Sequence, residues 1–68
     1  MTIIIQALDS EGNRWFRNAH HQWQATRGTN CHFPNAIEAG KIYHEAIIAN
    51  RFVDPDTRME EIELVELK

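Results

Sequence analysis

Five side chains of this sequence are of the types that bind zinc or act as nucleophiles and bases. They are the one cysteine and the four histidines: His20, His21, Cys31, His32 and His44. Structural zinc sites usually pair their ligands with about two to five residues between them, so that both reach one ion. Here four of the five come as two adjacent pairs, whose members point to opposite sides of an extended chain, and His44 stands alone. We therefore expect no metal and no other cofactor.

Cys31 is also a candidate nucleophile. A reactive thiolate needs a base or a positive environment, and its direct neighbour His32 is poorly placed to act as that base in an extended segment. Ser10 is the sole serine and lies in a predicted turn. A chain of 68 residues also has little interior for a substrate cleft. We expect that the protein is not an enzyme.

A third group of side chains has the types that bind single-stranded nucleic acid, because basic and aromatic residues alternate in it. Its members are Arg14, Trp15, Arg17, Trp23 and Arg27. Three arginines supply few phosphate contacts, and the isoelectric point of about 5.7 is far from a basic nucleic-acid-binding domain. A nucleic-acid-binding module stays an alternative hypothesis, with direct nucleic-acid binding the less favoured one.

The acidic residues are concentrated in the second half of the chain. The net charge is −3, and residues 35–68 hold four basic and eight acidic side chains. Six of the acids share one stretch: Asp54, Asp56, Glu60, Glu61, Glu63 and Glu66. Such a stretch repels polyanions and membrane surfaces and favours a basic partner. It predicts contact with a partner that has a basic surface.

The elements that would position these residues can be read from periodicity. Residues 2–8 read as a strand, with apolar side chains on both faces, and residues 9–13 as a hairpin turn. A second strand starts near Arg14 and breaks at residues 18–19. Alternation over residues 21–26 predicts a third strand, or a continuation of the second after a bulge.

The helix has the clearest signals. Pro34 suits a helix entry, and Asn35 followed by Glu38 fits a capping box. The helix is expected from Ala36 to about Asn50. Its core face is predicted to hold Ala36, Ala39, Ile42, Tyr43, Ala46, Ile47 and Ala49.

The final strand is expected over residues 59–67, with a change of parity that suggests a bulge or a twisted edge. The predicted fold is α+β: a small antiparallel sheet of three to four strands with one helix packed across it, in the order β-β-(β)-α-β. The length allows a single domain, residues 1–68. No apolar run approaches the roughly 20 residues of a membrane span, and no signal peptide is visible, so we expect a soluble cytoplasmic protein.

The outward face of the predicted helix is unusual. Ile37, Lys41, His44 and Ile48 recur there at helical spacing, and two isoleucines are unexpected on a face that only meets water. These residues are candidates for docking on a partner or on a second copy of the chain. Phe52 and Val53 would extend such a surface.

Two tracts carry a resemblance. Residues 33–39 (Phe-Pro-Asn-Ala-Ile-Glu-Ala) enter a helix, and residues 61–67 (Glu-Ile-Glu-Leu-Val-Glu-Leu) form an acidic closing strand. This arrangement resembles small phage-encoded α+β accessory proteins, including anti-CRISPR-type inhibitors. The resemblance implies a protein that binds and inhibits a bacterial host defence complex in the host cytoplasm, by protein–protein contacts and by mimicry of nucleic acid. A self-associating regulatory subunit remains a further alternative.

Overall fold

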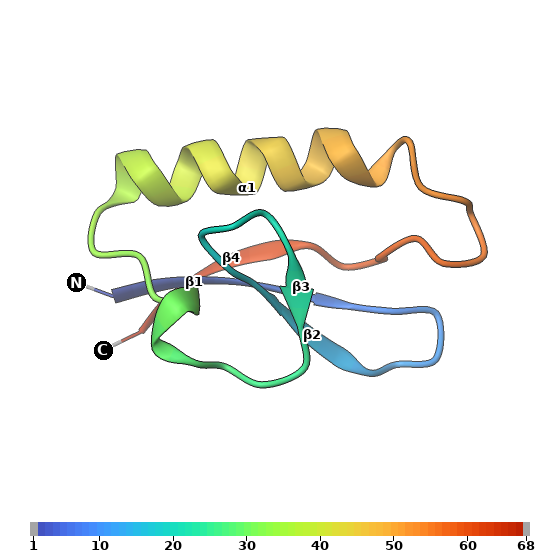
Figure 1. The fold of residues 1–68 in the computed structure, drawn as a ribbon, viewed down its shortest axis with the longest axis horizontal. Helices are drawn as coiled ribbons and strands as arrows, with labels where there is room; N and C mark the ends of the chain where they lie inside the picture. The colour runs from blue at the N-terminus through green and yellow to red at the C-terminus, as the bar shows by residue number, and fades with distance from the viewer. Residues whose placement is uncertain (1, 68) are drawn as a thin grey trace.

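A computed structural model describes residues 2–67, in which one helix packs on one face of a four-stranded antiparallel sheet and runs along β1 (Figure 1). The elements in chain order are β1 (Thr2–Leu8), β2 (Arg14–Arg17), β3 (Trp23–Gln24), the 3₁₀ turn η1 (Thr29–Cys31), α1 (Ala36–Asn50) and β4 (Glu63–Leu67). The strands lie in the order β3-β2-β1-β4. The predicted α+β fold and its element order are confirmed.

Strand β1 is the centre of the core. Ile3, Ile5 and Ala7 face the helix, and all three are buried. Ile4 points to the opposite face of the sheet and is buried as well. Apolar side chains on both faces of a strand suit a central position in the sheet, where other parts of the chain cover both faces.

The turn between β1 and β2 forms at residues 9–13, as predicted. The backbone N–H of Gly12 donates to the carbonyl of Asp9 at 3.0 Å, and Gly12 has a φ of +84°. This geometry is a turn followed by one left-handed residue, a common three-residue hairpin connection. Glycine suits the left-handed position because it has no Cβ to clash.

The turn between β2 and β3 repeats this geometry at residues 18–22. The N–H of His21 donates to the carbonyl of Asn18 at 3.2 Å, and His21 has a φ of +62°. The predicted break at residues 18–19 is therefore confirmed, and it is a tight turn that reverses the chain.

Strand β3 is shorter than the alternation over residues 21–26 suggested. It pairs with β2 only through Phe16↔Gln24 and Arg17↔Trp23. The Gln24 side chain then donates to the carbonyl of Thr26 at 2.8 Å and to Oδ1 of Asn30 at 3.2 Å. These bonds turn the chain out of the sheet towards η1.

Phe33 extends the sheet beside β1, at the point where β2 has already left it. Its backbone exchanges two hydrogen bonds with Ile3, at 2.8 and 2.9 Å. The Phe33 side chain joins the buried cluster of Ile3, Ile5 and Ala39. The residue that precedes Pro34 thus fixes the start of the helix onto the core.

Helix α1 begins as the capping pattern predicts. Oδ1 of Asn35 accepts the backbone N–H of Glu38 at 2.7 Å. Ala39 and Ala46 are buried against the sheet, which confirms the centre of the predicted core face. Its margins were wrong: Ala36 and Ala49 are exposed, because they lie on the flanks of the face and near the two ends of the helix.

Strand β4 begins at Glu63, four residues later than predicted. Met59 is held at the end of the helix instead, since its N–H and carbonyl both bond to the Asn50 side chain, at 2.9 and 2.8 Å. The register of β4 with β1 is continuous from Glu63 to Leu67, so the suggested bulge is wrong. The parity change arises because Leu64 faces the helix side while Val65 and Leu67 face the other side. Within residues 2–67, no helix has the length and apolar character needed to cross a membrane.

Candidate functional site

The four predicted docking residues of the helix form one line on its outward side, which we call the helix stripe: Ile37, Lys41, His44 and Ile48. All four are exposed, and the Ile37 side chain is 75% accessible. Phe52, 85% accessible, lies just beyond the end of the helix. The stripe points away from the sheet, because the buried residues Ala39 and Ala46 lie on the opposite side of α1.

The six predicted acidic contact residues are also all exposed. Two of them lie in the loop that follows α1, two directly precede β4 and two belong to β4: Asp54, Asp56, Glu60, Glu61, Glu63 and Glu66. Glu63 accepts from Nε2 of Gln6 at 2.6 Å and lies 3.5 Å from Nη1 of Arg14. Among residues 2–67, the other five form no ion pair. Arg58 is the one basic side chain within the loop 54–61, and its guanidinium donates to the carbonyls of Arg51 and Val53.

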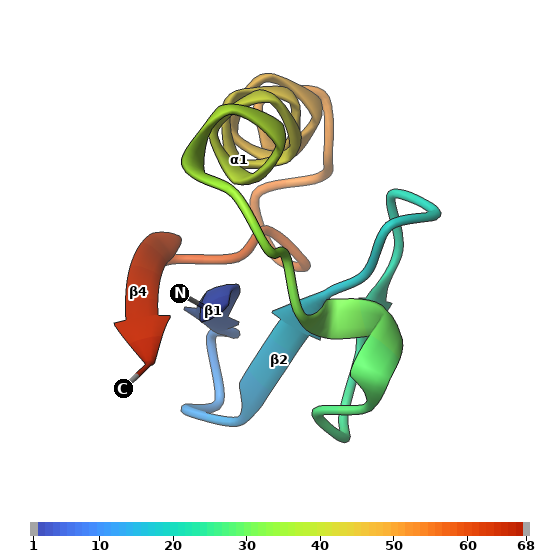
Figure 2. The same ribbon diagram turned by 90° about the vertical axis from the view of Figure 1, so that its left-hand side faces the viewer.

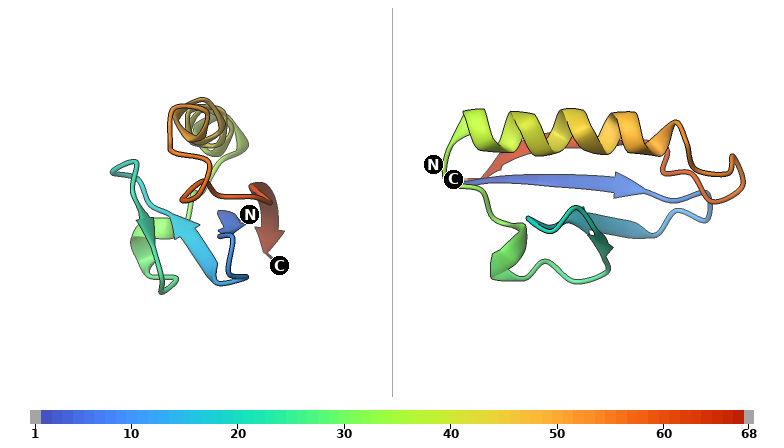
Figure 3. Two further views of the ribbon diagram at one scale, coloured as in Figure 1. Left: turned by 90° about the vertical axis from the view of Figure 1, so that its right-hand side faces the viewer. Right: turned by 45° about the horizontal axis from the view of Figure 1, so that its top comes forward.

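The helix stripe and the acidic residues occupy different sides of the molecule. In the end-on views the helix lies above the sheet and β4 forms its outer border (Figures 2 and 3). The stripe points away from the sheet, whereas the acidic residues follow the loop 54–61 and then the sheet edge. The structure therefore places the helix stripe and the acidic residues on separate surfaces.

The backbone of β4 carries a feature that the sequence analysis did not identify. The N–H and C=O groups of Ile3 bond to Phe33, so they point away from β4. Because these directions alternate along a strand, β1 bonds to β4 through Thr2, Ile4 and Gln6. Their partners are Leu67, Val65 and Glu63.

The intervening residues of β4 therefore turn their backbone groups outward. They are Leu64 and Glu66, and both residues are exposed. β4 is the last strand in the sheet order, so no strand among residues 2–67 covers this side. The parity change over residues 59–67 had two predicted explanations, a bulge or a twisted edge, and β4 does form an edge of the sheet.

The basic and aromatic residues of the nucleic-acid alternative are not brought onto one surface. Trp15 pairs with Ala7 and so faces the helix side, while Arg14 pairs with Leu8 on the other side. Nε1 of Trp15 donates to Oδ2 of Asp9 at 2.9 Å. Arg27 is exposed in the loop before η1.

Arg17 is the residue of this group that the structure withdraws from solvent. It is 6% accessible, and its guanidinium carbon lies 5.2 Å from the centre of the Trp23 ring. Burial lowers the pKa of Arg17, and the nearby charge of Glu45 opposes that shift. A cation held against an aromatic ring in this way is stabilised within the fold, and it is withdrawn from phosphate contacts.

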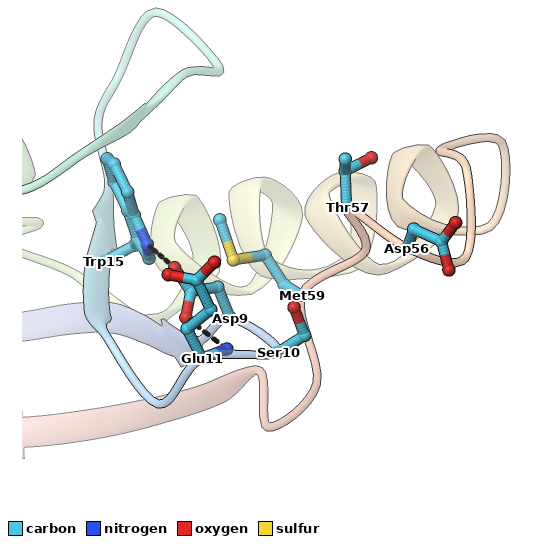
Figure 4. Close-up of a pocket in the computed structure, with 7 residues that line it drawn as sticks. All are labelled: Asp9, Ser10, Glu11, Trp15, Asp56, Thr57 and Met59. Atoms are coloured by element: carbon cyan, nitrogen blue, oxygen red, sulfur yellow. Dashed lines mark hydrogen bonds between the residues drawn. The ribbon is translucent and has the colours of Figure 1, made fainter.

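A pocket of about 250 Å³ lies where the first hairpin turn meets the loop after the helix (Figure 4). Its lining residues are Asp9, Ser10, Glu11, Trp15, Asp56, Thr57 and Met59. The Asp9 carboxylate accepts from the Trp15 indole and from the backbone N–H groups of Glu11 and Asn13. These bonds, led by that of Trp15, lower the pKa of Asp9. The Asp9 carboxylate therefore stabilises the hairpin turn that contains it.

The five candidate zinc ligands differ in their exposure to solvent. Cys31 is buried, with its Sγ 3.7 Å from Oδ1 of Asn30, and all four histidines are exposed. Burial raises the pKa of the Cys31 thiol, which keeps it protonated. In the described range 2–67, no three His, Cys, Asp or Glu side chains gather closely enough to hold a metal ion.

Comparison with known proteins gives no further guide to function: no protein-family model, curated protein or solved structure matches this chain.

Proposed function

We propose that this protein acts by stoichiometric binding to a partner protein with a basic surface. The observation that supports the proposal is the row of five exposed carboxylates without a cation partner among residues 2–67, which runs along the loop 54–61 and β4. Uncompensated charge of one sign raises the association rate with an oppositely charged surface.

The apolar side chains supply the second part of the proposal. Exposed charge pairs add about 0–1 kcal/mol each, so carboxylates alone give little affinity. Buried apolar anchors usually dominate the binding free energy and slow dissociation. Ile37, Ile48 and Phe52 are the exposed apolar side chains on and beside the helix stripe, and we assign this role to them.

The partner that suits this surface is a bacterial defence complex that holds nucleic acid in a channel lined with Lys and Arg. Carboxylates spaced along an edge would occupy such a channel in place of phosphates. The protein would then act as an inhibitor in the cytoplasm of a bacterial host, without turnover of a substrate.

Affinity capture from a bacterial lysate, followed by mass spectrometry, would identify the partner. Its binding would then be measured by stopped-flow fluorescence and calorimetry with two separate variants. One variant reverses charge (Glu60→Lys, Glu61→Lys, Glu63→Lys), and the other alters the stripe (Ile37→Asp, Ile48→Asp). The first should lower the association rate at least tenfold at low salt, and the second should raise the dissociation rate.

Two outcomes would contradict the proposal. Unchanged binding by a protein that combines both sets of substitutions would show that neither surface contributes to partner binding. Filter binding that shows a nucleic-acid affinity with a steep salt dependence would replace protein binding by phosphate contacts.

A further inference from the structure

The two edges of the sheet differ in how well their backbone groups are protected. β3 forms one edge with only two residues, Trp23 and Gln24. Oε1 of Gln24 accepts from the side-chain amides of Asn18 and Asn30, so polar side chains crowd this edge. β4 forms the other edge with five residues. A long edge of free N–H and C=O groups is a template for a further strand.

The outward backbone groups of β4 belong to Leu64 and Glu66, as the pairing of β1 requires. An antiparallel strand would exchange N–H···O=C bonds with both residues. Both end-on views show β4 at the outer border of the sheet, and no other element formed by residues 2–67 lies beyond it (Figures 2 and 3). Leu64 and Glu66 are both exposed, so a further strand has access to this edge.

The side chains of β4 specify the chemistry of such a strand. Glu63, Val65 and Leu67 lie on the helix-free face, and Leu64 and Glu66 lie on the helix side, so each face of the edge carries one acidic residue beside apolar ones. Cross-strand pairs of opposite charge stabilise a sheet, by roughly 0.2–1 kcal/mol each. The matching strand would carry Lys or Arg opposite each glutamate and apolar residues between them.

We propose that a basic, extended segment of the partner protein adds to the sheet as a fifth strand along β4. The proposal rests on the function proposed above and identifies how the acidic surface recognises its partner. The carboxylates of Glu60 and Glu61, directly before β4, extend the negative charge beyond the strand. They would meet further basic residues of the same segment.

A second copy of this chain suits the edge less well than a basic segment. Pairing β4 with its own copy would bring four carboxylates from each chain to one seam: Glu60, Glu61, Glu63 and Glu66. Like charges across a sheet are destabilising. The charge of the edge therefore selects against self-pairing while it attracts a basic strand.

The test uses a synthetic peptide, acetyl-Thr-Lys-Val-Val-Lys-Thr-Lys-amide, whose Lys-Val-Val-Lys core matches residues 66 to 63 in antiparallel register. N-methylation of its first Lys and second Val removes the two N–H groups that would pair with Glu66 and Leu64. N-methylation of the first Val and second Lys is the matched control, since those N–H groups point away from β4. Affinities would be measured by calorimetry against the whole protein.

The protein supplies a second pair of variants. Leu64→Pro removes one outward N–H and keeps every carboxylate, and proline is tolerated on the open side of an edge strand. Leu64→Ala is its control for the lost side chain. Circular dichroism would verify folding, and the N-methylated peptides give the answer even if the proline variant does not fold.

We expect the first N-methylated peptide and Leu64→Pro each to weaken binding at least tenfold relative to their controls. Hydrogen exchange at the amides of Leu64 and Glu66 should slow when the unmodified peptide binds. Equal binding of both N-methylated peptides, with a loss only on charge reversal, would overturn strand addition and leave the acidic surface intact. Unchanged partner binding after both the acidic residues and the helix stripe are substituted would instead overturn the proposed function itself. A dimer that forms through β4 in sedimentation would overturn the choice of occupant.

Discussion

Asp9 and Asn18 hold equivalent positions in two successive hairpin turns. Oδ1 of Asp9 accepts the N–H groups of Glu11 and Asn13, each at 2.9 Å. Oδ1 of Asn18 accepts those of His20 and Gln22, at 2.9 and 3.1 Å. In both turns the side-chain oxygen accepts backbone N–H groups that the hydrogen bonds of the turn leave without a partner. The turns differ at the left-handed position, which is glycine in the first and His21 in the second.

This difference predicts opposite effects of two substitutions. His21→Gly should raise the free energy of unfolding by up to about 1 kcal/mol, because a non-glycine residue at positive φ is strained. Gly12→Ala should lower it by about 1 kcal/mol for the same reason, although a Cβ there meets no atom within 4 Å. Urea denaturation followed by tryptophan fluorescence would measure both. The same sign for the two changes would contradict the equivalence of the turns.

The Asp9 carboxylate should make the stability of the protein depend on pH in the acidic range. Its hydrogen bonds, first from Trp15 and then from the backbone of Asn13, lower its pKa from the ordinary value of 3.8. A carboxylate whose pKa is lower in the folded than in the unfolded state stabilises the fold at pH values above its unfolded-state pKa. This stabilisation is lost as the pH falls through the folded-state pKa.

Asp9→Asn should therefore be less stable than wild type at pH 6, and the difference should shrink below about pH 4. Asp56→Asn serves as the control, since the Asp56 carboxylate accepts no hydrogen bond in the described part of the chain. Thermal unfolding across this pH range would measure the effect. If the difference in stability between Asp9→Asn and wild type does not change with pH, the charge of the Asp9 carboxylate does not stabilise the turn.

Gly40 lies in the middle of α1 without a conformational need for glycine. It is absent from the positive-φ positions, and a Cβ built there meets nothing within 4 Å. Gly40→Ala should raise the free energy of unfolding by about 1 kcal/mol, because alanine loses less backbone entropy in a helix. Chemical denaturation would measure the gain, and a loss of stability would indicate that the helix approaches another surface at this point.

The Cys31 thiol should be unreactive in the folded protein. It is buried, and its raised pKa keeps it protonated at neutral pH. A disulfide reagent such as Ellman's reagent should label it at least a hundredfold more slowly in buffer than in concentrated urea. Rapid labelling of the folded protein would contradict this burial and restore Cys31 as a candidate nucleophile.

Local signals in the sequence were sufficient for much of the fold. The Ile-rich run, Gly12 and the Asn35 cap each predicted the element that forms there. The ends of β3 and β4 could not be predicted, because they depend on contacts distant in the chain. Examples are the Asn50 side chain, which holds Met59, and Phe33, which takes the place beside Ile3.

The same limit applies to the candidate surfaces. Helical periodicity correctly placed Ile37 and Ile48 outside the core. It could not show that the acidic residues lie on a different side, because that depends on which strand closes the sheet. The outward direction of the Leu64 and Glu66 backbone follows only from the register of β1 and its bridge to Phe33.

The pairing of Thr2 with Leu67 brings the two ends of the described chain together, as Figure 1 shows. The sheet therefore cannot be completed during synthesis until residue 67 has left the ribosome, and the closure of so long a loop favours slow folding. The same proximity suits circular permutation: a short linker across these ends, with a new opening in the exposed loop 54–57, should preserve the native topology. Such a permutant would make β4 and β1 consecutive in sequence, and it should fold faster than the natural order.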